Sequence, residues 1–169
     1  MKPAGLPKRA RGASAVHVVE VGVEGKPIPR WRGKVQRFCA RVLHAAGASQ
    51  WELSLLLCDD EKMRALNRQY RGKDSTTDVL SFPREAARLP RTRLLDGAVV
   101  TGDIAISMDM VRRNAGEYGV TEDEELKRLL VHGILHCAGM DHGTTGRGRM
   151  LSFQESLLRA LKKERIIEK

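Results

Sequence analysis

Hydrophobic positions along the chain follow two different periods, and the alternation of the two predicts a domain that mixes helices and strands. Apolar residues that alternate with polar ones indicate strands, because successive side chains of a strand point to opposite faces. Apolar residues spaced three and four apart indicate helices with one buried face. The expected strands are residues 16–23, 51–57, 78–82 and 98–106. The expected helices are residues 30–46, 59–70, 107–118, 149–167 and one that runs from Thr121 to the neighbourhood of Gly139.

Polar residues and turn formers support these boundaries. Asp59, Ser107 and Thr121 each stand where a helix is expected to begin, and Glu124 follows Thr121 at the spacing of a capping box. Pro83 ends the third expected strand. The chain contains neither an internal repeat nor a domain linker. The predicted fold class is therefore α+β, with one four-stranded mixed sheet covered by about five helices.

Length and composition describe one domain. The chain has 169 residues, of which 41% are hydrophobic and 30% charged, as expected of a soluble globular protein. Residues 1–14 are expected to form a disordered basic tail, and residues 15–169 a single domain. Apolar stretches are too short to span a membrane, and the basic N-terminus lacks the apolar core of a secretory signal. Three cysteines without CxxC spacing predict no disulfide framework and favour the cytoplasm.

The most distinctive chemistry lies in residues 132–142, which read HGILHCAGMDH. His132 and His136 are four residues apart, so on a helix their rings share one face and can reach one metal ion. Gly139 can adopt the left-handed conformation that ends a helix, which would allow the chain to bring His142 to the same ion. Three neutral imidazoles with one open position for water are typical of a catalytic zinc site.

The general base of a zinc peptidase is missing from this motif. Peptidases of the HExxH type place a glutamate directly after the first histidine, where this chain has Gly133. Gly133 provides either room for a large substrate or close packing against a neighbouring element. Zinc can lower the pKa of bound water to about 7, which supplies a nucleophile without that glutamate. Asp141 is a candidate for catalysis or for orienting a ligand, and otherwise a turn residue. Cys137 is expected to pack.

Charge suggests a polyanionic partner without proving one. The net charge is +9, from 30 Lys and Arg against 21 Asp and Glu. This balance suits a nucleic acid, and also a protein that is merely soluble and basic. Aromatic residues make up only 4% of the chain, so base stacking is not expected to be the main mode of binding. In the loop at residues 71–77, Arg71 and Lys73 are candidates for binding substrate phosphates.

Three sequence blocks together resemble the YbeY family of bacterial endoribonucleases. The blocks are the histidine motif, LNRQYRGKDSTTDVLSFP at residues 66–83 and TGDIAIS at residues 101–107. The resemblance covers residues 16–160 and implies an α+β fold with a zincin-like metal helix. It also implies a single-strand-specific endoribonuclease that matures ribosomal RNA, including the 3′ end of the 16S RNA, and acts in ribosome quality control. The implied partners are ribosomal RNA and the ribosome or its small subunit.

The resemblance assigns roles to particular residues. It implies one zinc ion per chain, held by the three histidines that correspond to His132, His136 and His142. It also implies a functionally essential arginine, which corresponds to Arg71. Met150, Gln154 and Glu155 match the family's pattern in the last helix, whereas the basic segment 84–96 and Met140 depart from it.

Two other functions stay open at this stage. A zinc peptidase or amide hydrolase would share the ligand spacing, although Gly133 argues against it. A non-enzymatic ribosome-assembly factor would hold a structural zinc ion, which needs a fourth protein ligand. Cys137 is poorly placed to be that ligand, whereas Asp141 remains a candidate.

Overall fold

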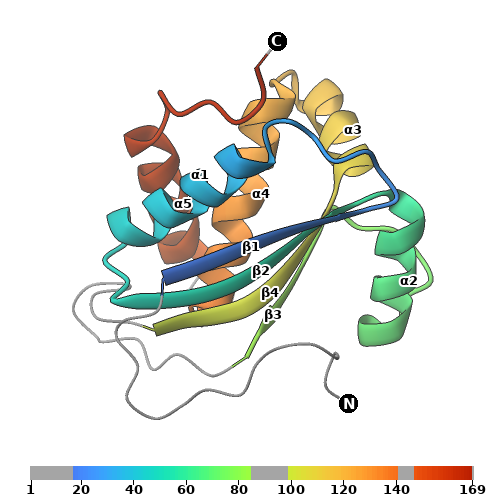
Figure 1. Ribbon diagram of the computed structural model, residues 1–169, viewed down its shortest axis with the longest axis horizontal. Helices are drawn as coiled ribbons and strands as arrows, with labels where there is room; N and C mark the ends of the chain where they lie inside the picture. The colour runs from blue at the N-terminus through green and yellow to red at the C-terminus, as the bar shows by residue number, and fades with distance from the viewer. Residues whose placement is uncertain (1–16, 85–98, 141–146, 169) are drawn as a thin grey trace.

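The fold is one four-stranded mixed sheet with five helices among the residues that the computed structural model describes, namely 17–84, 99–140 and 147–168. The predicted fold class is confirmed. In chain order the elements are β1 (His17–Glu24), α1 (Arg32–Ala45), β2 (Gln50–Cys58), α2 (Asp60–Arg71), β3 (Val79–Pro83), β4 (Val99–Ser107), α3 (Met108–Tyr118), α4 (Glu122–Cys137) and α5 (Arg147–Ala160). Figure 1 shows these elements in colours that follow the chain.

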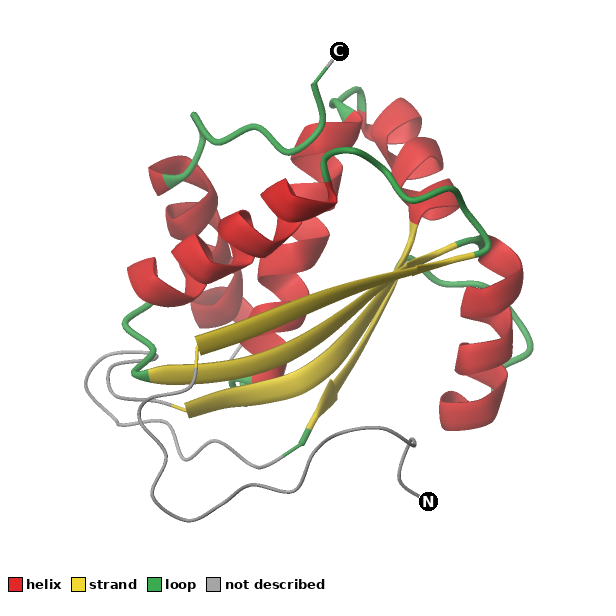
Figure 2. Ribbon diagram, viewed as in Figure 1, coloured by secondary structure: helices red, strands yellow, loops and turns green. Residues whose placement is uncertain are grey.

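The strands are ordered β1-β2-β4-β3 across the sheet. Strands β1, β2 and β4 are parallel, and β3 runs antiparallel to β4 at one edge. Helices α1, α4 and α5 gather on one side of the sheet, whereas α2 stands apart from them beside one end of it (Figure 2). Strand β3 is thus an edge strand, and its outer side is not covered by another strand of the described sheet.

The main core lies between the sheet and α4. Alternate residues of β2 are buried because one face of this strand packs on the helices. Helix α4 is buried along most of its length, and each buried Leu or Ile side chain contributes about 1.5–3 kcal/mol. The leucine, isoleucine and valine side chains that α4 buries almost completely are Leu126, Leu129, Leu130, Val131, Ile134 and Leu135. A helix held on several sides is a rigid support for the histidines that it carries.

Side-chain caps confirm three of the predicted helix starts. The Asp59 carboxylate accepts a hydrogen bond from the Lys62 N–H at 2.9 Å. Ser107 caps α3 in the same way, and Thr121 forms the predicted capping box with Glu124 at the start of α4. These caps pair backbone N–H groups that a helix cannot pair internally.

The C-terminal helix is shorter than predicted. The expected helix covers residues 149–167, whereas α5 begins two residues earlier, at Arg147, and ends at Ala160. The reason is a buried contact with the first turn of α4. Asp123 Oδ1 accepts hydrogen bonds from the backbone N–H groups of Ile166 and Ile167, at 2.7 and 2.9 Å. Lys127 donates to the Glu164 carbonyl at 2.9 Å, so the last residues leave the helix and pack on α4.

Some predicted segments fall outside the described residues. These are the tail at 1–14 and most of the basic segment at 84–96. The division into a tail and one domain therefore stays a prediction. Among the described helices, none is long and apolar enough to cross a bilayer.

Candidate metal centre

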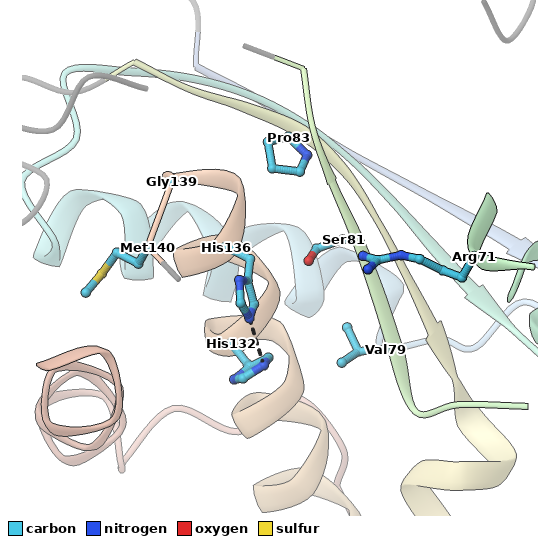
Figure 3. A pocket seen from close by; sticks show the side chains of 8 residues that line it. All are labelled: Arg71, Val79, Ser81, Pro83, His132, His136, Gly139 and Met140. Carbon is cyan, nitrogen blue, oxygen red and sulfur yellow. Dashed lines mark hydrogen bonds between the residues drawn. The ribbon is translucent and has the colours of Figure 1, made fainter. Parts of the chain in front are cut away.

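A cavity of about 520 Å³ lies between helix α4 and edge strand β3. Helix α4 and the turn that follows it provide one wall, β3 provides another, and the last residue of α2 reaches in from the side (Figure 3). The lining residues are Arg71, Val79, Ser81, Pro83, His132, His136, Gly139 and Met140. Two predicted metal ligands and the predicted essential arginine therefore share one cavity.

The two histidines of α4 turn their Nε2 atoms toward each other. These atoms are 3.2 Å apart, and the ring centres are 4.7 Å apart with planes at 73° (Figure 3). Two nitrogens bound to one tetrahedral zinc ion at about 2.0–2.1 Å each would lie about 3.3 Å apart. The positions of the His132 and His136 rings therefore fit two ligands of one metal ion.

Gln154 of α5 orients the first of these rings. The His132 Nδ1 atom lies 3.0 Å from the Gln154 Oε1 atom, and the Gln154 side chain is buried. An amide oxygen only accepts hydrogen bonds, so Nδ1 carries the ring proton and the Nε2 lone pair faces the cavity. In the sequence, Gln154 only matches a family pattern. Its contact with His132 could not be predicted, because the two residues are 22 positions apart in the chain.

Helix α4 ends where the sequence predicts. Gly139 has φ +85°, and its N–H donates to the His136 carbonyl at 2.9 Å. The Met140 N–H donates to the Leu135 carbonyl at 3.0 Å, which completes a Schellman motif. The turn places Met140 in the wall of the cavity. Glycine suits this position because a residue with a Cβ atom would be strained at a positive φ.

The remaining candidates on this motif lie outside the described residues. They are the third predicted ligand, His142, and the candidate carboxylate, Asp141. Within the described ranges no group of three His, Cys, Asp or Glu side chains could hold a metal ion. The roles of His142 and Asp141 therefore stay predictions.

The structure answers the question about Gly133 in favour of packing. A Cβ atom on Gly133 would lie 2.9 Å from Cγ2 of Ile104 in strand β4. A glutamate at this position would meet the same side chain. The close contact between α4 and the sheet therefore explains the glycine and disfavours a peptidase of the HExxH type.

We expect Gly133→Ala to destabilise the protein by about 1–3 kcal/mol, because the new methyl group overpacks the contact with Ile104. Gly116→Ala in helix α3 is the matched control, since a Cβ there would meet no atom within 4 Å. The control should stabilise the protein by up to about 1 kcal/mol through helix propensity. Urea unfolding of both variants measures the difference, and equal stabilisation by the two would contradict the packing explanation.

Cys137 packs against the sheet, as the sequence suggests. Its side chain is buried, and a Cβ on Gly102 of β4 would lie 2.5 Å from the Cys137 sulfur. Burial raises the pKa of the Cys137 thiol to about 12, and the charge of Asp103 adds to this shift. The Cys137 sulfur is held against β4 and does not line the metal cavity, so it acts as a packing group.

Arg71 is the last residue of α2, and its guanidinium is directed toward the cavity (Figure 3). Gly72 follows with φ +67° and ends the helix. The side chain is exposed, and Arg71 makes no ion pair with any residue that the structure describes. Its charge is therefore available to an anion in the cavity.

The loop after Arg71 is fixed to neighbouring elements through Asp60. The Asp60 Oδ1 atom accepts hydrogen bonds from Thr76 at 3.1 Å and from Ser107 at 2.7 Å, and Arg113 pairs with the other oxygen. Burial alone would raise the pKa of Asp60, but hydrogen bonds from Ser107, Arg113 and Thr76 hold it below its ordinary value. The charged carboxylate at the start of α2 thus holds Thr76, and with it the loop that follows Arg71, close to Ser107.

The other predicted phosphate-binding residue lies elsewhere. Lys73 is exposed but does not line the cavity. Asp74 beside it accepts two hydrogen bonds from Arg64, at 2.8 and 3.0 Å. Of the two predicted phosphate contacts, the structure brings Arg71 to the histidines and leaves Lys73 at the outer surface.

Comparisons with known proteins show which family the chain resembles. The family model described as "Endoribonuclease YbeY" matches residues 23–162. The protein named Endoribonuclease YbeY from Treponema pallidum (strain Nichols) is 43% identical over 148 residues, which cover 86% of this chain and 90% of that protein. The protein of the same name from Aquifex aeolicus is 41% identical over 115 residues, covering 68% of this chain and 72% of that protein.

A solved structure supports the fold. The solution structure of TM1509 from Thermotoga maritima is similar with a TM-score of 0.62 and 21% sequence identity. The similarity covers 86% of this chain and 91% of that chain. At this level of identity it supports the arrangement of helices and strands and carries no argument about the site.

Proposed function

The chain belongs to the endoribonuclease YbeY family, and from this premise we propose that it is a zinc-dependent endoribonuclease that cleaves single-stranded regions of ribosomal RNA. The observation that carries the proposal is the meeting of His132, His136 and Arg71 in one cavity. Ribosomal RNA within the ribosome or its small subunit is the proposed partner, and the cytoplasm the proposed location.

We assign the metal to His132, His136 and His142, with one ion per chain. The facing Nε2 atoms of the first two, 3.2 Å apart, support this assignment. Imidazole nitrogens suit zinc among the metals of a cell, although copper, nickel and cobalt also bind them. When bound, zinc would supply a Lewis acid and a water molecule of lowered pKa.

The protein's own residues would then bind and orient the RNA. Arg71 offers a planar fork of N–H donors that matches two oxygens of the phosphate to be cleaved. Because Arg71 directs its guanidinium toward the cavity, it would stabilise charge that develops on these oxygens as the P–O bond breaks. Lys73, outside the cavity, would bind a neighbouring phosphate. Asp141 is proposed to orient the attacking group or accept its proton.

A comparison of substrates tests this function. The metal-loaded protein should cleave a single-stranded RNA, lose this activity after treatment with a chelator, and regain it when zinc is added back. The same protein should leave a broad peptide library intact. Hydrolysis of peptides, or RNA cleavage that survives complete removal of metal, would contradict the proposal.

We expect Gln154→Ala to weaken metal binding by about 10- to 100-fold, because the His132 ring loses the acceptor that fixes its orientation. Gln154→Glu keeps an acceptor oxygen and should restore most of the affinity. Gln69→Ala, at an exposed position of α2, should leave the affinity unchanged. Zinc titration against a competing chelator measures all three variants, and unchanged affinity in Gln154→Ala would remove the positioning role.

A further inference from the structure

A second cavity, of about 350 Å³, lies on the other side of edge strand β3 from the candidate metal centre. Alternate residues of β3 separate the two cavities, because successive side chains of a strand point to opposite faces. Ser81 and Pro83 line the metal cavity, whereas Phe82 lines the second one. A polymer that reaches both cavities has to pass only the edge of β3.

Two consecutive residues at the end of α2 divide between these cavities. Arg71 lines the metal cavity, and Tyr70 lines the second one. The Tyr70 side chain is 50% exposed, and its ring lies 5.0 Å from the ring of Phe82. The proposed phosphate contact and an accessible aromatic ring are therefore neighbours in the chain.

The walls of the second cavity offer flat apolar surface together with polar groups. Leu56 and Leu66 provide aliphatic surface beside the two aromatic rings. Ser54 and Asp103 also line the cavity, and both accept hydrogen bonds from Arg84. A planar ring with apolar faces and a hydrogen-bonding edge suits such a cavity, and this is the chemistry of a nucleobase.

The charges around the cavity favour a nucleic acid over an apolar peptide. Arg68, Arg71 and Lys73 are exposed on the last turn of α2 and just beyond it. Cations beside an aromatic surface bind a phosphate backbone whose bases stack next to it. Tyr70 and Arg71 are consecutive residues, so a base in the second cavity would lie close to the phosphate bound at Arg71.

We infer that the cavity formed by Tyr70, Phe82 and Leu66 is a nucleobase subsite, which holds one unpaired base of the RNA beside the phosphate bound at Arg71. The inference rests on the proposed function, since it takes RNA to be the polymer in the metal cavity. It explains a preference for single strands, because a base held in the cavity is not available for pairing. One such position agrees with a chain that has few aromatic residues.

An abasic scan tests the subsite. Binding of a short fluorescent single-stranded RNA to the metal-loaded protein is measured by anisotropy, while cleavage of the same samples is followed on gels. Removing the base at one position next to the cleaved phosphate should weaken binding to the wild type by about 5- to 150-fold. Tyr70→Ala should weaken binding of the intact RNA by a similar factor and should lose the penalty at that position.

Two variants serve as controls for the ring itself. Tyr70→Phe keeps the stacking surface and should bind the intact RNA as the wild type does. Tyr118→Ala removes the chain's other tyrosine, which is 59% exposed at the end of α3 and lines neither cavity, and it should change nothing. Thermal unfolding of each variant shows that the comparison is made between folded proteins.

The outcomes separate the subsite from the catalytic proposal. If Tyr70→Ala keeps the full abasic penalty, or binds the intact RNA as tightly as the wild type, the subsite is wrong. If Tyr70→Ala binds ribosomes less tightly but binds free RNA as the wild type does, the subsite is also wrong. That result would assign the cavity to a protein partner. A wild type that shows the Tyr70-dependent penalty but cleaves no RNA would refute the catalytic proposal and keep the subsite.

Discussion

The His136→Ala variant is expected to lose its metal ion and to cleave single-stranded RNA about 10³-fold more slowly than the wild type. The two facing rings of α4 are two of the three proposed histidine ligands, and removal of either ring leaves too few ligands for tight binding. A metal ion that stabilises charge in the transition state contributes several kcal/mol, and each 1.4 kcal/mol corresponds to about tenfold in rate.

The fold of this variant should survive, because the lost ring faces the cavity while its neighbours in α4 hold the core. His44→Ala is the matched control, since His44 is exposed at the end of α1 and far from the motif in sequence. Metal content by mass spectrometry and initial rates of RNA cleavage are measured on the same preparations. A His136→Ala protein that keeps a full equivalent of metal would exclude this ring as a ligand.

The second large effect is expected for Arg71→Ala, which should slow RNA cleavage by about 10²- to 10³-fold while the metal content stays unchanged. Arg71 reaches into the metal cavity without a described ion-pair partner, so its charge is available to the substrate. A contact that strengthens as charge develops on the phosphate should appear mainly in kcat. Loss of one phosphate contact should also weaken the salt dependence of RNA binding. The slope of the logarithm of the binding constant against the logarithm of the salt concentration should become shallower by about 0.7 for a single strand.

Arg68→Ala provides the comparison for this result. Arg68 stands one turn earlier on α2, is exposed, and does not line the cavity. Its loss should cost at most about tenfold, through weaker binding alone. Arg71→Lys should recover only part of the rate, because a lysine cannot form the paired hydrogen bonds of a guanidinium. Equal rates of RNA cleavage for Arg71→Ala and Arg68→Ala would contradict a specific role of Arg71 in the reaction. Arg71 would then contribute only general electrostatic attraction for RNA.

The sequence predicted most of the local structure because the relevant signals are local. The period of apolar residues located the strands and helices, and the caps at Ser107 and Thr121 fixed two helix starts. Gly139 predicted the end of α4, and the four-residue spacing predicted that His132 and His136 share a face. These features depend on residues within one or two turns of each other.

The sequence could not supply contacts between residues that are distant in the chain. The end of α5 depends on Asp123. Its carboxylate accepts a hydrogen bond from the N–H group of Ile166, which lies 43 residues later in the chain. The reason for Gly133 is Ile104 on strand β4, and the partner of His132 is Gln154 on α5. Such pairings arise from packing in three dimensions, for which one sequence carries no periodic signal.

The apolar cavity beside Tyr70 was missed for a related reason. The low aromatic content predicts that stacking is not the main mode of RNA binding. That prediction concerns the average over the whole surface and not any single position on it. The structure brings Tyr70 together with Phe82, which is 12 residues away along the chain. A single aromatic pair beside the proposed phosphate contact becomes visible only once the strand and the helix are placed together.

The most direct test of the account is X-ray absorption at the zinc edge on the loaded protein, because the central claim is a metal ion with three histidine ligands and one position open to solvent. The account predicts a coordination shell of three imidazole nitrogens and one light oxygen ligand at about 2.0–2.1 Å. In His136→Ala the zinc-edge signal of the purified protein should fall to background, because the variant loses the ion. A sulfur ligand at about 2.3 Å, or a shell that is identical in His136→Ala, would contradict the account.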